Sequence, residues 1–277
     1  MNMSKTIHQF CRFRQRKVIG PASEQDMALA QPVFVNNPAA QNRVGVLLLH
    51  GFRQNPFCMH HLTAELKESV YQLSVPVLPH HLDDLDVFEQ TTAEQWISCA
   101  QQHYQSVRQQ CDHVIVVGLS MGAVLAALVN DECQDADHLV LLAPAFYPPS
   151  VLKFSNVISS VMSFLGFRYL AAASGDVGLE GAYDVTFCRT PIKIYPQLNA
   201  VCVQGRKTLS RIHVPVDFFV GKNDQVLNTK KIKKAFFEIP SADKRYIQLS
   251  NSKHVLSLDA GINTITQRLQ ELIGLYS

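Results

Sequence analysis

The pattern Gly118-x-Ser120-x-Gly122 places a serine between two glycines directly after an apolar run, residues 114–117. Residues 123–129 then favour a helix. A strand that turns abruptly into a helix strains the residue at the turn, and flanking Cβ atoms would collide with the adjoining strand and helix. The sequence therefore predicts Ser120 at a strand-to-helix turn, where its hydroxyl can act as a nucleophile. For the motif alone, the alternative is an ordinary turn without chemistry.

A second apolar run, residues 44–49, ends in His-Gly-Phe at 50–52. A glycine at this point lets the backbone approach a reacting group. Acyl transfer needs two N–H donors for the oxyanion, and losing one costs about a hundredfold or more in rate. We expect the backbone N–H groups of Phe52 and Met121 to be these donors. His50 is interpreted as a buried structural histidine, because a base there would lie behind the oxyanion loop.

The catalytic partners of the serine should follow it in the order acid, then histidine. A strand-like run after the serine leads into a turn-rich loop that carries Asp224. A later strand-like run is followed by a polar loop that holds His254 ahead of the final helix. Because four elements occur in this order at strand ends, we predict Ser120 as nucleophile, Asp224 as acid and His254 as base.

On these motifs the sequence resembles the α/β-hydrolase superfamily, and more narrowly its bacterial carboxylesterase and monoacylglycerol lipase branch. The matching residues are 50–52, Trp96, 118–122, 221–224, 252–255 and Asp259. The resemblance covers residues 40–275. It implies an acyl-enzyme on Ser120, with His254 as base, Asp224 as the acid that orients it, and Phe52 and Met121 as the oxyanion hole. Two departures are Ala123 in place of a second glycine, and Pro-His-His-Leu at 79–82 in place of Gly-His-Gly.

Strands and helices alternate from residue 33 onward. Alternation of this kind predicts the α/β class with a doubly wound, mostly parallel sheet, as in the α/β-hydrolase fold. A helix should open with a capping box at Thr91-x-x-Glu94, and the last helix should start near Asp259 as its N-cap. With 277 residues and 47% hydrophobic content, residues 31–277 are expected to form one domain.

The interval 148–212 is too long for a simple connection between two sheet strands. Its apolar residues gather over 151–167 at helical spacing, interrupted by charged and polar side chains that disfavour a membrane span. We therefore expect a cap inserted between two strands, with the apolar face of its helix closing over Ser120. Such a face would form an acyl pocket.

Residues 1–30 form a basic N-terminal arm, with Lys5 and four further basic residues before Gly20 and no apolar segment of a secretory signal. The arm is interpreted as solvated or as an added edge strand. The alternative is a weak contact with a membrane surface, because basic segments attract anionic headgroups. We expect no stable membrane insertion.

The cysteines are odd in number, scattered and without a C-x-x-C pattern. They are Cys11, Cys58, Cys99, Cys111, Cys133, Cys188 and Cys202. This pattern favours reduced thiols in a cytoplasm over a disulfide framework or a metal site. The chain is therefore predicted to be cytoplasmic.

Composition and motifs also limit the partners. A net charge of +2 argues against nucleic acid. The histidine pairs at 60–61 and 80–81 are not expected to bind metal, because adjacent histidines point apart and no HExxH pattern accompanies them. No phosphate loop or dinucleotide fingerprint is present in the sequence, so no cofactor is predicted.

The expected function is that of a serine carboxylic-ester hydrolase acting on small, uncharged acyl esters of short to medium chain length, such as monoacylglycerols. An acyltransferase or a thioesterase could use the same residues. A binding module that keeps the fold without turnover is the alternative from another class. The sequence indicates neither the substrate-binding residues nor the oligomeric state.

Overall fold

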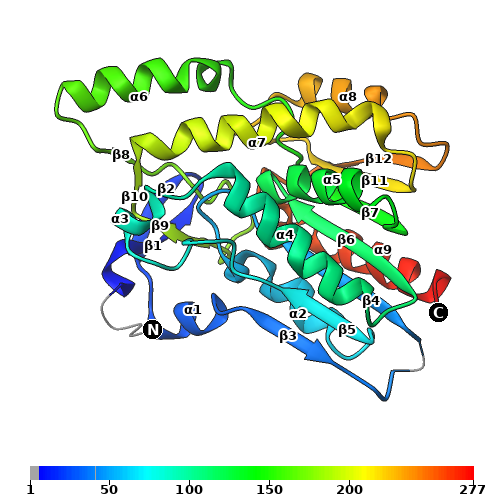
Figure 1. The fold of residues 1–277 in the computed structure, drawn as a ribbon. Helices are drawn as coiled ribbons and strands as arrows, with labels where there is room; N and C mark the ends of the chain where they lie inside the picture. Colours follow the sequence, from blue (N-terminus) through cyan, green and yellow to red (C-terminus); the bar gives the residue numbers. More distant parts are fainter. Residues whose placement is uncertain (1–5, 41) are drawn as a thin grey trace.

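The computed structural model of the protein describes residues 6–40 and 42–277. A seven-stranded sheet runs through its centre (Figure 1). Its strands are β3 (Val33–Asn36), β4 (Val44–Leu49), β5 (Gln72–Val75), β6 (His113–Leu119), β7 (His138–Leu142), β11 (Val216–Gly221) and β12 (Lys244–Leu249). They lie in the order β12-β11-β7-β6-β4-β5-β3, and all neighbours are parallel except β3, which runs antiparallel to β5.

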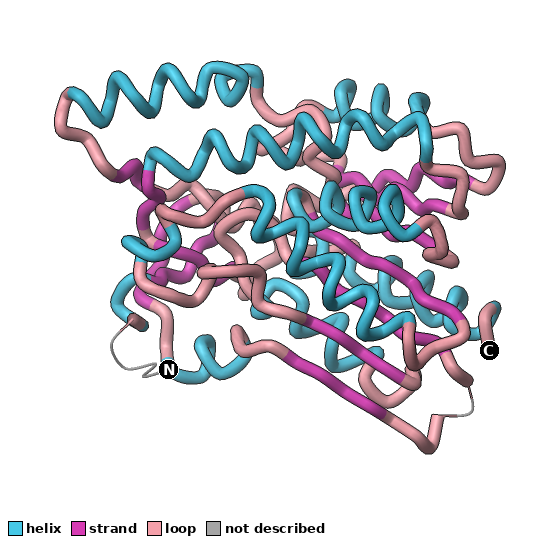
Figure 2. Tube along the Cα trace, viewed as in Figure 1, coloured by secondary structure: helices cyan, strands magenta, loops and turns pink. Residues whose placement is uncertain are grey.

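Helices cover both faces of this sheet (Figure 2). They are α2 (His60–Leu66), α4 (Ala93–Arg108), α5 (Met121–Cys133), α8 (Thr229–Glu238) and α9 (Ile262–Leu275). The helices α4 and α5 pack together on one face, while α2 and α9 contact each other on the opposite face. Every residue of β4, β7 and β11 is buried, and these strands are apolar except for His138 and Asp217. The prediction of a doubly wound, mostly parallel α/β sheet is confirmed.

The two predicted helix caps are both wrong in detail. The capping box of α4 lies one residue later than predicted, with Thr92 as N-cap and Gln95 as its partner. The final helix α9 has Gly261 as N-cap. Asp259 instead accepts hydrogen bonds from three backbone amides in two other loops, at Gly178, Leu179 and Lys253. Its carboxylate therefore joins the insertion to the loop of His254.

Residues 148–212 lie between β7 and β11. Their helices and strands are α6 (Ser155–Phe164), β8 (Tyr169–Ala171), β9 (Asp184–Phe187), β10 (Arg189–Pro191) and α7 (Tyr195–Thr208). The helix α7 packs on α5, and α6 packs on the outer side of α7 (Figure 1). A Cβ atom on Gly205 would overlap the side chain of Val124, so the glycine allows α7 and α5 to approach closely.

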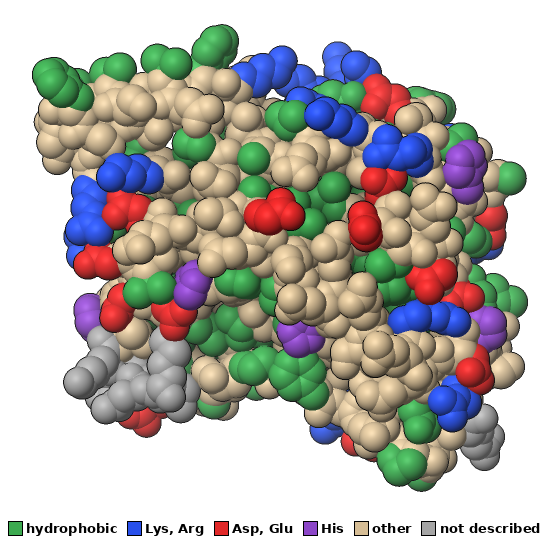
Figure 3. All heavy atoms as spheres, viewed as in Figure 1, with side chains coloured by type: hydrophobic (Ala, Val, Ile, Leu, Met, Phe, Trp, Pro, Cys, Tyr) green, Lys and Arg blue, Asp and Glu red, His purple; other side chains and the backbone are tan. Residues whose placement is uncertain are grey.

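The apolar face of α6 points outward, contrary to the prediction that it closes over Ser120. Val157 is 64% exposed, Val161 52% and Phe164 90%. Figure 3 shows hydrophobic side chains along the outer edge of this part of the molecule. The buried residues of α6 are Ser155 and Ser159, because α6 turns its serine face toward α7. Because α7 lies between α6 and the sheet, the exposed apolar face of α6 cannot reach Ser120.

The basic arm forms a hairpin of β1 (Phe10–Arg14) and β2 (Lys17–Pro21), followed by the short helix α1 (Glu24–Leu29). The strand β1 pairs antiparallel with β9 of the insertion, in a separate three-stranded sheet of order β2-β1-β9. The arm therefore supplies strands to a second sheet and is anchored by buried Phe10 and Phe13. Lys5, part of the predicted arm, lies outside the described residues. A further short helix, α3 (Leu85–Phe88), contacts β10.

The prediction that all cysteines are reduced is wrong for one pair. Cys11 on β1 forms a disulfide with Cys188, which directly follows β9, at a Cα–Cα distance of 5.1 Å. Pairing of these strands brings the two Cα atoms within the range that a disulfide spans. The pair is 177 residues apart in the sequence, so spacing gave no signal. Cys58, Cys99, Cys111, Cys133 and Cys202 are free thiols.

None of the helices described, over 6–40 and 42–277, combines the length and the apolar character needed to cross a bilayer.

Candidate active site

Ser120 occupies a strained turn between β6 and α5, with φ of 57° and ψ of −108°. A Cβ atom on Gly118 would overlap the backbone of Gly122, and one on Gly122 would overlap the carbonyl groups at the end of β4. The two glycines therefore permit the close packing of strand and helix that the motif predicts. The amide of Ser120 donates to the carbonyl of Leu142 at 2.8 Å, which fixes the turn against β7.

His254 and Asp224 complete a hydrogen-bonded chain with the serine. The Nε2 atom of His254 lies 3.0 Å from the Oγ atom of Ser120, and its Nδ1 atom lies 2.8 Å from Oδ2 of Asp224. The other carboxylate oxygen of Asp224 accepts from the amides of Val226 and Leu227 at 2.7 and 2.8 Å. These amides orient the carboxylate, so the structure brings together the three side chains that the sequence singles out.

The charges of Asp224 and His254 stabilise each other. Burial raises the pKa of Asp224. His254 and the two amides lower this pKa by more than burial raises it, so the net pKa lies below its ordinary value. Burial lowers the pKa of His254, and the nearby negative charge of Asp224 with its hydrogen bond outweighs this effect, so that the net pKa is raised. The acid therefore stays ionised and strengthens the histidine as a base.

The two residues predicted to supply the oxyanion hole both lie near the serine. Met121 is the first residue of α5, where helix amides lack intrahelical partners. Phe52 follows Gly51, and a Cβ atom built on that glycine would lie 3.3 Å from the Cβ of Ser120. Within the described ranges, neither amide donates a hydrogen bond to another protein group. Both are therefore available to a ligand oxygen.

His50 lies behind this loop, as expected for a structural histidine. It is fully buried, its Nε2 atom accepts from the amide of Leu78 at 3.0 Å, and its Nδ1–H donates to the carbonyl of Gly51 at 2.9 Å. Burial lowers the pKa of His50 to about 4, so the ring is neutral near pH 7. The segment 79–82 packs here too, since the ring of His81 lies 4.8 Å from that of His50. This segment therefore packs behind the loop that carries Phe52.

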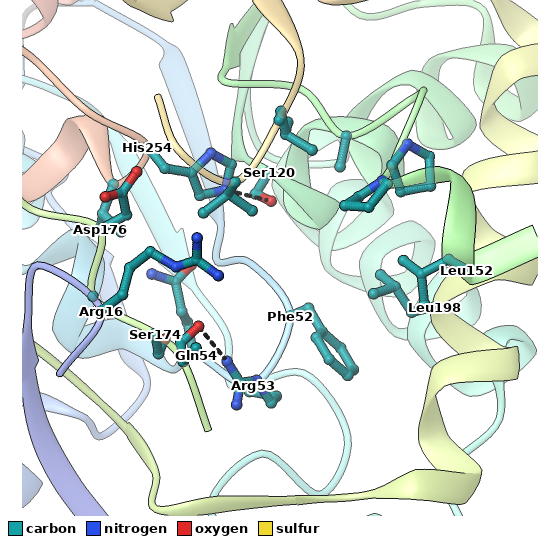
Figure 4. Close-up of a pocket in the computed structure, with 18 of the residues that line it drawn as sticks. Arg16, Phe52, Arg53, Gln54, Ser120, Leu152, Ser174, Asp176, Leu198 and His254 are labelled. Carbon is teal, nitrogen blue, oxygen red and sulfur yellow. Dashed lines mark hydrogen bonds between the residues drawn. The ribbon is translucent and has the colours of Figure 1, made fainter. Parts of the chain in front are cut away.

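A cavity of about 280 Å³ opens beside Ser120 and His254. Figure 4 shows two different ends. One end is apolar and includes Phe52, Leu152 and Leu198. The other end is charged and polar, and its labelled side chains are Arg16, Arg53, Gln54, Ser174 and Asp176. These cavity residues were not predicted from the sequence. The position of Arg53 directly after Phe52 could have indicated that its side chain lies near the active site.

Among residues 6–40 and 42–277, no group of three or more His, Cys, Asp or Glu side chains has a geometry that could hold a metal ion.

A parallel sheet that carries a nucleophile turn, an acid loop and a histidine loop at its carboxyl edge defines the α/β hydrolases. The model of the alpha/beta hydrolase family matches residues 46–261, and the chain belongs to this family. The predicted membership is thereby confirmed.

Two curated relatives come from the branch that the motifs indicate. A thermostable monoacylglycerol lipase of Bacillus sp. (strain H-257) is 28% identical over 245 residues, covering 88% of this chain and 94% of the relative. A carboxylesterase of Bacillus subtilis (strain 168) is 21% identical over 229 residues, covering 82% and 91%. The first of these spans nearly its full length, so the likeness includes the insertion as well as the sheet.

Solved structures share the fold at lower identity. One, from work on the metagenome-derived lipolytic enzymes LipS and LipT, has a TM-score of 0.81 at 22% identity and covers 88% of this chain and 97% of its own. The monoacylglycerol lipase of Paleococcus ferrophilus has a TM-score of 0.68 at 15% identity, with 89% and 98% covered.

Proposed function

We propose that the protein is a serine carboxylic-ester hydrolase for short- to medium-chain acyl esters such as monoacylglycerols. The hydrogen-bonded chain from Ser120 through His254 to Asp224, opening into a partly apolar cavity, carries this proposal. The names of the two curated relatives, a monoacylglycerol lipase and a carboxylesterase, support ester hydrolysis as the reaction.

In the first half of the proposed reaction, Oγ of Ser120 attacks the ester carbonyl while Nε2 of His254 takes its proton. The carbonyl oxygen becomes negative and is stabilised by the amides of Phe52 and Met121. His254 then gives the proton to the departing alcohol, which leaves an acyl-enzyme. Asp224 holds the imidazole tautomer and stabilises its positive charge throughout.

In the second half, a water molecule attacks the acyl-enzyme. His254 takes a proton from this water and returns it to Oγ of Ser120 as the carboxylic acid leaves. Each turnover thus consumes one ester and one water, releases one alcohol and one acid, and restores the enzyme.

The apolar end of the cavity suits the acyl chain. We propose that residues 148–212 act as a cap over it, with Leu198 of α7 and Leu152 before α6 in contact with the substrate. Ligand pockets commonly measure about 300–1,000 Å³, so this cavity of about 280 Å³ lies just below that range. A short or medium chain fits that volume better than a long one.

Labelling with a fluorophosphonate probe tests the proposal. Wild-type protein should be labelled and should hydrolyse p-nitrophenyl esters, whereas a folded Ser120→Ala variant should do neither. Full labelling of the alanine variant would overturn the assignment of the nucleophile. An unlabelled wild type would favour a binding module, and ester formation with added glycerol in place of free acid would favour an acyltransferase.

A cytoplasmic location stays a prediction. The disulfide between Cys11 and Cys188 removes the cysteine pattern as its support.

A further inference from the structure

The charged end of the cavity contains an arginine that is buried without a counter-ion. Arg53 is only 7% exposed. Its Nη1 donates to Oγ1 of Thr190 at 2.6 Å and its Nη2 to the carbonyl of Ala173 at 3.4 Å, and both acceptors are neutral. Its Nε has no hydrogen-bond partner among the residues described. Since arginine stays charged in proteins, an unpaired positive charge is held here at a cost in free energy.

A second arginine reaches the same cavity from the N-terminal hairpin. Arg16 lies at the turn between β1 and β2 with φ of 65°. Its amide donates to the carbonyl of Gly175, and its Nη1 donates to the carbonyl of Gln225 at 3.1 Å. Figure 4 shows its guanidinium directed into the cavity, between His254 and Arg53. The hairpin therefore brings a positive charge close to the reacting serine.

Neither arginine forms an ion pair with Asp or Glu in the described part of the chain, whereas Arg12 of the same hairpin pairs with Asp26. Asp176 also lines the cavity, but its Oδ2 accepts from the amide of Gln225. Burial raises the pKa of this carboxyl group above its ordinary value. In the described part of the chain, Asp176 therefore forms no ion pair with either arginine.

The charge of Asp184 acts on Arg53, but in the described part of the chain the two side chains form no ion pair. The carboxylate of Asp184 accepts from Nε2 of Gln54 at 2.8 Å, and burial raises its pKa to about 6. The pKa of Arg53 is lowered by burial. Interactions with Tyr195 and Asp184 raise this pKa, whereas the positive charge of Arg16 lowers it. Both guanidinium groups line the same cavity, where one anion could contact them together.

We propose that Arg16 and Arg53 form an anion subsite, and that the alcohol part of the natural ester carries a carboxylate or a phosphate group. The inference rests on the proposed ester hydrolysis and names its substrate class more narrowly. With the acyl chain at Leu152 and Leu198, the carbonyl lies at Ser120 and the alcohol part extends toward the arginines. Guanidinium groups match the oxygens of both anions through paired N–H donors. The expectation of an uncharged substrate is replaced by that of an anionic amphiphile.

Three butyrate esters test the subsite: those of glycerol, of glycerol 3-phosphate and of 3-hydroxypropanoate. Released butyrate gives kcat/KM for each. The wild type should prefer at least one anionic ester over the glycerol ester, and the better one identifies phosphate or carboxylate as the group bound. Charge-assisted hydrogen bonds predict that Arg16→Gln and Arg53→Gln each lower the anionic-to-neutral ratio at least about tenfold.

Lys17→Gln is the matched control, because Lys17 is the next residue of the hairpin, is exposed and lies outside the cavity lining. This variant removes the same charge and should leave the ratio unchanged. Melting temperatures show whether buried Arg53→Gln is folded, and exposed Arg16→Gln keeps the test decisive if it is not. A wild type without preference for either anion, or an unchanged ratio in Arg16→Gln, would overturn the subsite.

Binding to the Ser120→Ala variant separates the subsite from the reaction. Calorimetry should detect glycerol 3-phosphate or 3-hydroxypropanoate but not glycerol, and adding Arg16→Gln should weaken that binding at least about tenfold. Hydrolysis of the glycerol ester alone, without binding of either anion, refutes the subsite and leaves the proposed function intact. Anion binding without hydrolysis of any ester supports the subsite and refutes the proposed function.

Discussion

Breaking the disulfide between Cys11 and Cys188 should destabilise the protein strongly. The bond closes a loop of 177 residues. A chain-entropy model assigns about 5 kcal/mol to a loop of that length, and measured disulfides typically contribute about 2–4 kcal/mol. For a domain of this size, 1 kcal/mol shifts the melting temperature by about 2–4 °C. We therefore expect the double variant Cys11→Ser, Cys188→Ser to melt roughly 5–15 °C lower than the oxidised wild type.

Thermal unfolding followed by circular dichroism measures this shift, with and without a reductant. Reductant should lower the melting temperature of the wild type to that of the double variant and leave the double variant unchanged. Cys133→Ser, which removes a free thiol, is the matched control and should respond to reductant as the wild type does.

Thiol titration in denaturant tests the bond itself. The oxidised protein should show the five free cysteines, and the reduced protein all seven. Seven thiols in protein purified under air, together with equal melting temperatures, would refute the bond. Five thiols without a difference in melting temperature would refute the argument from loop entropy.

Three further outcomes are expected at the site and around it. Asp224→Asn should lose on the order of ten-thousandfold in kcat while keeping its melting temperature, and a nearly active Asp224→Asn enzyme would contradict the proposed role of Asp224 as the triad acid. Asp217→Asn should instead lose stability, because Asp217 is buried against His138 and Arg268. Since the pKa of His254 is raised and the neutral ring is the base, kcat/KM should rise with pH through a midpoint above 6.5, and residual activity of Asp224→Asn should show a lower midpoint. Leu198→Asp should depress turnover of butyrate more than of acetate esters, whereas exposed Val161→Asp should leave this chain-length profile of soluble esters unchanged; a changed profile in Val161→Asp would place α6 in the acyl pocket.

The central sheet and the three proposed catalytic positions could be predicted because their signals are local. Ser120 directly follows β6, while Asp224 and His254 lie in the loops after β11 and β12, and strands of a parallel sheet place their carboxyl ends together. The alternation of strands and helices was readable for the same reason. Local sequence therefore determines both the strands and the loops that follow them.

The insertion and the hairpin were not predictable in this way. The pattern of α6 shows that the helix has an apolar face, but not whether that face meets protein or solvent. In β1, Phe10 and Phe13 are both buried although three residues apart, because the register shifts between Arg12 and Phe13. That irregularity hides the period of two that identifies a strand.

The pairing of β1 with β9 also determines when the protein can become complete during its synthesis. Phe13 pairs with Asp184, and at about 5–20 residues per second a ribosome needs roughly 9–35 seconds to make the chain between them. Throughout that interval β1 can pair only with β2 of its own hairpin, because β9, the partner on its other edge, has not been made. The nascent chain is therefore most open to chaperones and proteases at its beginning. The hairpin that carries Arg16 can take its place beside the cavity only after β9 of the insertion has emerged.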